Sequence, residues 1–169
     1  MVMRVVAGDL LGQPEAESAT SQTIDLAMTG YIQEAALLSW RYEAVVGRVG
    51  LLLDLRASFL ETVTIGVLVA RNVVRFEWTT PKLPGPRWYA ISGLTTRPTA
   101  PFSISIGLEP GTDLNVDATS AKLYLGTSAV SAAAPPDFTE HDPGSLRQLM
   151  PNWETVLDIH DILKLATSA

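Results

Sequence analysis

Cysteine is absent from this chain of 169 residues. The sequence therefore has no disulfide, no thiol nucleophile and no cysteine ligand for zinc or an iron–sulfur cluster. Such a composition fits a reducing compartment.

Long apolar runs are also lacking. The first six residues begin like a signal peptide, but their apolar run is too short and Asp9 interrupts it. No stretch approaches the length of a membrane-spanning helix. We therefore expect a cytoplasmic protein that makes no use of a membrane.

Motifs of catalysis and nucleotide binding are missing as well. The chain contains no Gly-x-Ser-x-Gly elbow, no His-Glu-x-x-His pair and neither of the glycine-rich phosphate loops. We expect no cofactor, and a non-catalytic protein is favoured over an enzyme. A pair of carboxylates for glycoside chemistry stays open, because the fold and not the spacing would set it.

Positive charge is scarce outside the middle of the chain. The net charge is −6 at pH 7, and the acidic excess lies in residues 1–39 and 101–169, whereas residues 40–100 carry more basic than acidic side chains. An acidic chain is a poor ligand for nucleic acid and a plausible partner for a basic protein. The alternative is that the acidic surface serves solubility alone.

What the chain does contain is a row of strand patterns from Ala35 to Trp78. Apolar and polar residues alternate through Leu38, Trp40 and Tyr42, and again from Val49 to Arg56, which predicts a hairpin. Residues 65–70 are apolar on both faces, and the alternation slips at residues 71–72, as at a turn or bulge. The expected core residues are Trp40, Leu53, Phe76 and Trp78.

The fold class that we predict is α+β. Further strands, such as residues 102–108, extend the pattern to an antiparallel sheet of roughly six to eight strands, curved or half closed. One helix is expected before the sheet, through Ile24, Ala27 and Met28, and one after it, from Trp153 to Leu165. An all-β sandwich or open barrel is the alternative. We expect a single domain over 1–169, with an N-terminal strand and loop (1–22) and an acidic C-terminal strap and helix (127–169).

Charged residues near the C-terminus form the candidate binding site. We expect acidic side chains to steer a basic protein partner, with two arginines of the sheet as further contacts; a homo-oligomer stays open. The tentative partner-binding residues are Asp137, Glu140, Asp142, Asp158, Asp161, Arg41 and Arg75.

Two other constellations are weaker. His141 and His160 each lie beside acids and could form a metal site, but their spacing matches no closed motif, and incidental solvated histidines are favoured. The aromatic residues Trp40, Trp78 and Tyr42 have strand spacing, which favours the core. If one of them is exposed beside an arginine, it would resemble an interface hot spot.

Three segments carry a resemblance: residues 38–42, residues 49–56 and residues 135–140, which read Leu-Ser-Trp-Arg-Tyr, Val-Gly-Leu-Leu-Leu-Asp-Leu-Arg and Pro-Pro-Asp-Phe-Thr-Glu. They look like segments of uncharacterised small acidic bacterial proteins. In size, acidity and lack of motifs the chain is similar to immunity proteins of bacterial toxin systems. That resemblance implies a non-enzymatic protein that binds a toxin domain through an acidic face, and it assigns no residue. The alternative is a small-ligand-binding or enzymatic domain with a pocket in the concave sheet.

Overall fold

The computed structural model describes residues 2–14, 22–25, 29–58, 60–79, 89–97, 101–137 and 139–165. These residues are mostly β-structure, with two short helices, α1 (Asp9–Gly12) and α3 (Pro143–Leu149). The strands are β1 (Met3–Val6), β2 (Gln22–Ile24), β3 (Ala36–Glu43), β4 (Arg48–Asp54), β5 (Ile65–Arg71), β6 (Arg75–Trp78), β7 (Ala90–Arg97), β8 (Phe102–Glu109), β9 (Thr112–Ala118), β10 (Ser120–Thr127) and β11 (Val156–Leu165).

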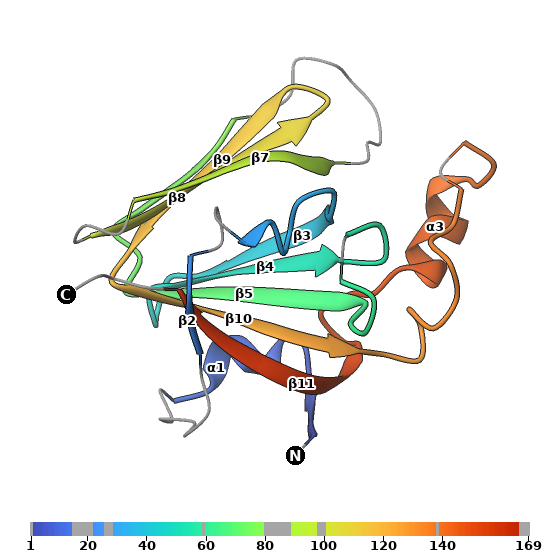
Figure 1. Cartoon of the computed structure of the whole chain (residues 1–169), viewed down its shortest axis with the longest axis horizontal. Helices are drawn as coiled ribbons and strands as arrows, with labels where there is room; N and C mark the ends of the chain where they lie inside the picture. The colour runs from blue at the N-terminus through green and yellow to red at the C-terminus, as the bar shows by residue number, and fades with distance from the viewer. Residues whose placement is uncertain are drawn as a thin grey trace.

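All these strands belong to one open sheet, in the order β1-β11-β10-β5-β4-β3-β7-β8-β9-β6, and β2 pairs in parallel with β11. The predicted antiparallel sheet is therefore confirmed, although it has 11 strands rather than six to eight. Figure 1 shows how the sheet folds back on itself: β7, β8 and β9 form a layer above β3, β4, β5 and β10, and α1 lies on the opposite side.

Two apolar cores hold the layers together. In β4, Val49, Leu51 and Leu53 face the core between the layers, whereas Leu52 faces a second core beneath α1. The neighbouring strand β5 is buried along its whole length, as its two apolar faces predict. Each fully buried leucine of this kind contributes about 1.5–3 kcal/mol relative to an exposed one. The phase slip after β5 is confirmed too, because Asn72 has a left-handed backbone with φ 49°.

A β-bulge in β3 changes which faces its side chains occupy. The register against β4 shifts between Leu37 and Ser39, so Leu38 is the extra residue and packs towards the second core. Trp40 and Tyr42 then point to the opposite face. Simple alternation predicts that Leu38 shares a face with the two aromatic residues. The bulge places Leu38 on the other face.

The predicted C-terminal helix from Trp153 to Leu165 is wrong, because residues 156–165 form β11. The pairing with β10 shifts at His160, which is an extra residue between Ile159 and Asp161. Before this bulge Ile159 faces the second core, and after it Leu163 faces the first. Joining two strand phases in this way gives the spacing of an apolar helical stripe, which explains the error.

The predicted N-terminal helix is wrong at Ile24, whereas the Thr29 amide donates to the Asp25 carbonyl oxygen at 3.1 Å, as in a helical turn. Residues 22–24 form β2, which pairs with the end of β11, while residues 26–28 lie outside the described part of the chain. The edge of β11 offers backbone hydrogen bonds that override the helical spacing of Ile24. Neither of the two helices in the described residues is long and apolar enough to cross a membrane.

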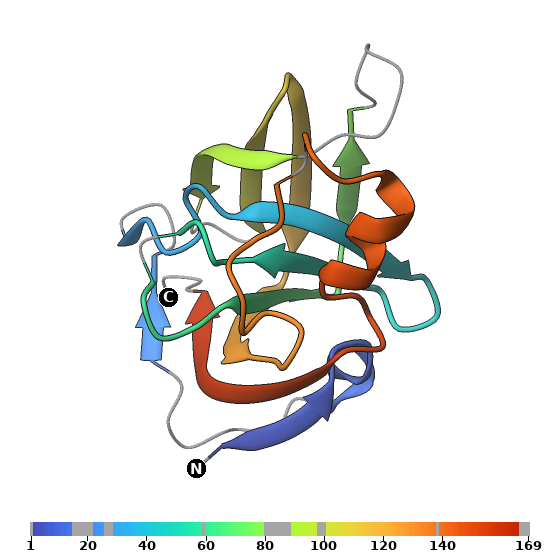
Figure 2. The same cartoon turned by 90° about the vertical axis from the view of Figure 1, so that its right-hand side faces the viewer.

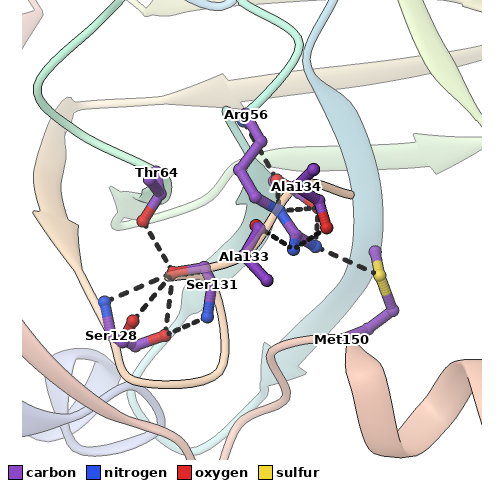
Figure 3. A network of polar contacts seen from close by, with 8 residues as sticks. Arg56, Thr64, Ser128, Ser131, Ala133, Ala134 and Met150 are labelled. Atoms are coloured by element: carbon purple, nitrogen blue, oxygen red, sulfur yellow. Dashed lines mark hydrogen bonds and ion pairs between the residues drawn. The ribbon is translucent and has the colours of Figure 1, made fainter. Parts of the chain in front are cut away.

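A strap, defined here as residues 128–136, leads from β10 towards α3 along the ends of the strands. Figure 3 shows two polar clusters that fasten it. The hydroxyl of Ser131, which is 1% exposed, lies 2.6 Å from that of Thr64 and 2.9 Å from that of Ser128. The guanidinium of Arg56 donates to the carbonyl oxygens of Ala133 and Ala134 at 3.1 and 3.3 Å. The strap therefore has a fixed course.

Helix α3, to which the strap leads, lies beyond the strand ends and outside both layers in Figures 1 and 2. It contains no buried residue. This short helix makes no layer against the sheet.

Candidate functional site

An aromatic surface is exposed where β3 loses its neighbour in the upper layer. The β3–β7 ladder contains one residue pair, Ala36 with Ala90. Among the described residues, β3 beyond Leu37 has a strand partner only in β4. The Trp40 and Tyr42 residues are consequently 39% and 47% exposed. The prediction that Trp40 belongs to the core is wrong, because β7 leaves β3 after Leu37 and the rings of β6 cover Trp40 only in part.

Aromatic residues of β6 meet those of β3. The ring centroids of Trp40 and Phe76 are 4.9 Å apart, and those of Trp40 and Trp78 are 6.4 Å apart. The Tyr42 ring is stacked at 6.5 Å on Phe76, and Tyr89 meets Trp78 edge-on at 5.4 Å. We call these five residues the aromatic surface. Its half-buried members, Phe76, Trp78 and Tyr89, pack against the first core, which holds the exposed rings in place.

Three exposed valines lie in the two segments that adjoin β3 and β6, the strands that carry most of the aromatic surface. Val45 and Val46 lie in the turn between β3 and β4, and Val74 lies just before β6. The two segments are in contact, because the Val73 amide donates to the Gly47 carbonyl at 2.9 Å. Of the nine large hydrophobic residues exposed in the described parts of the chain, five lie here: Trp40, Tyr42, Val45, Val46 and Val74.

Exposed aromatic and aliphatic side chains of this kind can bind another molecule. Contiguous exposed apolar surface marks interaction sites, and Trp and Tyr supply contact area at low entropic cost. The nearest charged residues of β6 are paired: Arg75 lies 2.6 Å from Glu77 and 3.8 Å from Asp117. The ion pair raises the pKa of the exposed Arg75 and lowers that of Glu77. Arg75 alternates with Phe76 and Trp78 on β6 and therefore points away from the aromatic rings, to the face that carries Glu77.

The predicted acidic residues divide into two groups. The first, the acidic loop, comprises Asp137, Glu140 and Asp142, all exposed, between the strap and α3. The hydroxyl and amide of Thr139 donate to Asp137, which lowers the pKa of that carboxyl group. Asp142 caps α3 by accepting from the hydroxyl of Ser145 and the amides of residues 144 and 145, and its pKa is lowered as well. Asp137 and Asp142 therefore keep their negative charge to a lower pH than ordinary aspartates do.

The second group, Asp158 and Asp161, lies on β11. Asp158 forms a bidentate ion pair with Arg4 of β1, at 2.8 and 3.0 Å, and this contact lowers its pKa. Much of its charge is thereby compensated, whereas Asp161 is exposed. No hydrogen bond or ion pair between described residues connects this group with the acidic loop.

Arg41 does not lie with the aromatic surface. It alternates with Trp40 and Tyr42 on β3 and so points to the opposite face, where its guanidinium lies 5.2 Å from the ring centroid of Trp153. The two arginines that the sequence grouped together, Arg41 and Arg75, thus serve different surfaces.

The histidines show no metal-binding arrangement. His160 Nε2 lies 3.0 Å from the Thr127 hydroxyl, and His141 is exposed in the acidic loop. Within the described ranges, no three His, Cys, Asp or Glu side chains are grouped so that they could hold a metal ion.

Sequence reasoning passed over two further residues, Arg48 and Arg71. They are direct partners in the antiparallel pairing of β4 with β5. The available signal was their position, one at the start of a predicted strand and one at the end of the next.

Comparison with known proteins gives no guide to function. No protein-family model matches the chain, and neither a curated protein nor a solved structure matches it.

Proposed function

We propose that this chain is a non-catalytic protein-binding domain of the immunity or antitoxin type, which neutralises a basic partner. The observation that carries the proposal is the exposure of Trp40 and Tyr42 on the part of β3 beyond Leu37, whose outer edge has no described strand partner. Large aromatic residues that pack against the core on one side and are exposed to solvent on the other are frequent anchors of protein interfaces.

Electrostatics supports a basic partner. The chain has a net charge of −6, and the carboxylates of the acidic loop are exposed. Complementary charge on two proteins raises their association rate, and this effect becomes smaller as the salt concentration increases. In this proposal the aromatic surface supplies affinity, and the acidic loop increases the rate of encounter.

Affinity capture with matched baits tests the proposal. Wild type, Trp40→Ala/Tyr42→Ala and Leu149→Ala are each used as bait in lysate of the native cells, and the bound proteins are quantified by mass spectrometry. Leu149, which is 42% exposed on α3, is the apolar control away from the aromatic surface. We expect a stoichiometric basic protein with wild type and Leu149→Ala, and its loss with the double variant. Identical recoveries with all three baits would exclude the aromatic surface as the binding site.

Association kinetics tests the second part. Replacing Asp137, Glu140 and Asp142 with Asn, Gln and Asn removes three charges, and Asn still caps a helix. With the captured protein as ligand, we expect slower association and a flatter dependence on salt, at an unchanged dissociation rate. Unchanged association kinetics would remove the acidic loop from the proposal.

The small-ligand alternative in its original form has less support. The space between the layers, which the concave face of the sheet encloses, holds the first core cluster of apolar side chains. Charged side chains instead converge on the opposite face, at α1.

A further inference from the structure

Three arginines from adjacent strands converge on the turn that contains α1. Arg48 of β4 and Arg71 of β5 are direct partners in the antiparallel register. Arg41 of β3 is opposite Gly50, two residues further along β4, and therefore shares their face. We call these three residues the arginine cluster. It lies on the face of the second core, opposite to the aromatic surface.

Hydrogen bonds fix two of the three guanidinium groups. Arg48 donates through Nη1 to the carbonyl oxygens of Leu11 and Gln13, the latter at 2.9 Å. Arg71 donates through Nη2 to the same Gln13 oxygen at 3.0 Å. Because both donors share one acceptor, their nitrogens lie no more than about 6 Å apart. Two positive charges are thus held side by side.

The third guanidinium group reaches the same turn from β3. Arg41 lies over the Trp153 ring, and its Nη1 is 3.2 Å from the position that a Cβ at Gly8 would occupy. The indole N–H of Trp153 donates to the Ser39 hydroxyl at 3.0 Å, so the ring beneath Arg41 is itself held in place. Arg41 is therefore positioned at one end of α1 and Arg48 and Arg71 at the other.

Within the described ranges, no carboxylate forms an ion pair with the arginine cluster. None of the three arginines forms an ion pair with a described residue, whereas Arg4, Arg56 and Arg75 each do so. Glu43 is opposite Arg48 in the register, yet it makes no ion pair with it. Like charges on directly facing residues destabilise a sheet unless something compensates them.

The buried side chain of Arg71 has an unpaired hydrogen-bond donor. Its residue is 4% exposed, and its Nε–H has no hydrogen-bond acceptor. Buried donors in native structures are nearly always satisfied, so an unpaired donor next to a second cation, Arg48, indicates an absent acceptor. Arg41 and Arg48 are partly exposed, which leaves the arginine cluster accessible to solvent.

A purely structural role explains only part of these contacts. Arg48 and Arg71 do bind carbonyl oxygens at the end of α1, as basic residues at helix ends often do. Neutral carbonyl groups, however, do not offset three positive charges, and they leave the Arg71 Nε–H unpaired. A compact oxyanion would satisfy both needs.

We propose that the arginine cluster binds the phosphate group of a small molecule. Phosphate offers several acceptor oxygens and up to two negative charges, and the guanidinium fork matches its geometry. In this site Arg71 is the buried base and Arg48 flanks it from β4, while Arg41, at the other end of α1, contributes positive charge. The site is separate from the aromatic surface, so it stands whether or not the chain binds a protein there.

Inorganic phosphate is the probe for the first experiment. The melting temperature of the whole chain is measured against phosphate concentration, with sodium chloride at matched ionic strength as the reference. We expect phosphate to raise the melting temperature and chloride to leave it unchanged. Arg48→Gln should weaken phosphate binding at least about tenfold, since it removes charge-assisted hydrogen bonds, and Arg41→Gln should weaken it less, since it removes only a nearby positive charge. Arg75→Gln is the matched control, because its guanidinium is paired on β6.

NMR distinguishes phosphate binding from a purely structural role of these arginines, because only binding changes their signals when phosphate is added. The Nε–H signal of Arg71 should shift downfield as phosphate supplies its missing acceptor, and the indole signal of Trp153 should move with Arg41. The proposal is overturned if phosphate stabilises no more than chloride, or if Arg41→Gln and Arg48→Gln respond to phosphate like wild type. Arg71→Lys is left out of the decision, because a buried substitution there can impair folding. A nucleoside monophosphate that competes with inorganic phosphate would identify an esterified ligand, and its failure to compete would assign the site to the free ion.

Discussion

Asp54 and Arg56, two residues apart at the end of β4, form a bidentate ion pair that is almost completely buried. Their closest approach is 2.6 Å between Arg56 Nη2 and Asp54 Oδ2, and the two side chains are 5% and 2% exposed for Arg56 and Asp54, respectively. Arg56 also donates to the strap at Ala133 and Ala134. One buried cation therefore joins the end of β4 to the segment that leads to the acidic loop.

Replacing Arg56 with Met is expected to destabilise the protein by about 3–5 kcal/mol, because the substitution leaves the Asp54 carboxylate buried without its partner. Denaturant unfolding measures the loss. The double variant Asp54→Asn/Arg56→Met is the control, and it should recover part of the loss because no charge is then buried alone. If Arg56→Met costs no more than about 1 kcal/mol, the pair does not have the burial and geometry described here.

Replacing Gly126 with Ala is expected to destabilise the β10–β11 ladder at its bulge. A Cβ at Gly126 would overlap the backbone carbonyl oxygen of Asp158, and a backbone atom cannot move aside as a side chain can. We expect a cost of about 1–3 kcal/mol, measured by thermal or denaturant unfolding. Gly93→Ala in β7 is the matched control, since a Cβ there meets nothing within 4 Å and its stability should stay near that of wild type. Equal stability of the two variants would contradict the bulge geometry.

Replacing Trp40 with Ala is expected to affect binding more than folding. Its side chain is partly exposed and its ring contacts are worth about 0.5–1.5 kcal/mol each. Leu68→Ala in β5, where the residue is fully buried, should cost about 2–5 kcal/mol. Urea unfolding of the two variants gives the comparison. A loss for Trp40→Ala as large as that for Leu68→Ala would show that Trp40 serves the core.

The pKa of Asp142 should lie below the usual aspartate value of 3.8, mainly because the Ser145 hydroxyl donates to its carboxylate. A carboxyl group with a lower pKa in the folded state adds stability above its unfolded pKa, and that contribution is lost as the pH falls through the folded pKa. Capping of α3 should therefore persist at neutral pH and disappear in strong acid. NMR titration of the carboxyl carbons, with the Gly144 amide as reporter, measures the change.

Two substitutions separate the causes of the lowered pKa values. Ser145→Ala should raise the pKa of Asp142 and leave that of Asp158 unchanged. Arg4→Gln should raise the pKa of Asp158 and leave that of Asp142 unchanged. If both substitutions moved both groups together, a general change in surface charge rather than the local hydrogen bonds would explain the titration.

Local patterns predicted much of the sheet. Strict alternation from Val49 to Arg56 placed Leu51 and Leu53 on one face and Leu52 on the other, as the two cores confirm. The apolar run 65–70 predicted a strand covered on both sides, and Asn72 a change of phase. These predictions succeeded because side-chain period and turn chemistry are properties of neighbouring residues.

Bulges and sheet order lay beyond such patterns. The extra residue His160 joins two strand phases in β11, and the resulting apolar spacing resembles that of a helix. The extra residue Leu38 changes the strand phase of β3 in the same way. The exposure of Trp40 depends on where β7 leaves β3, and the arginine cluster depends on the pairing of β4 with β5. Both sites result from contacts between strands, which no single stretch of sequence contains.

The pairing of β1 with β11 has a consequence for the making of the protein. Arg4 and Asp158 meet across 154 positions of the chain, and the second core joins Leu10 and Leu11 to Trp153 and Leu157. While the ribosome is still adding residues, the β3–β4–β5 segment can form its local pairs, but neither face is complete before the last strand emerges. Folding that waits for such distant contacts is slow. Until β11 has been synthesised, the outer edge of β10 has no strand partner, and an unpaired edge of this kind is prone to aggregation.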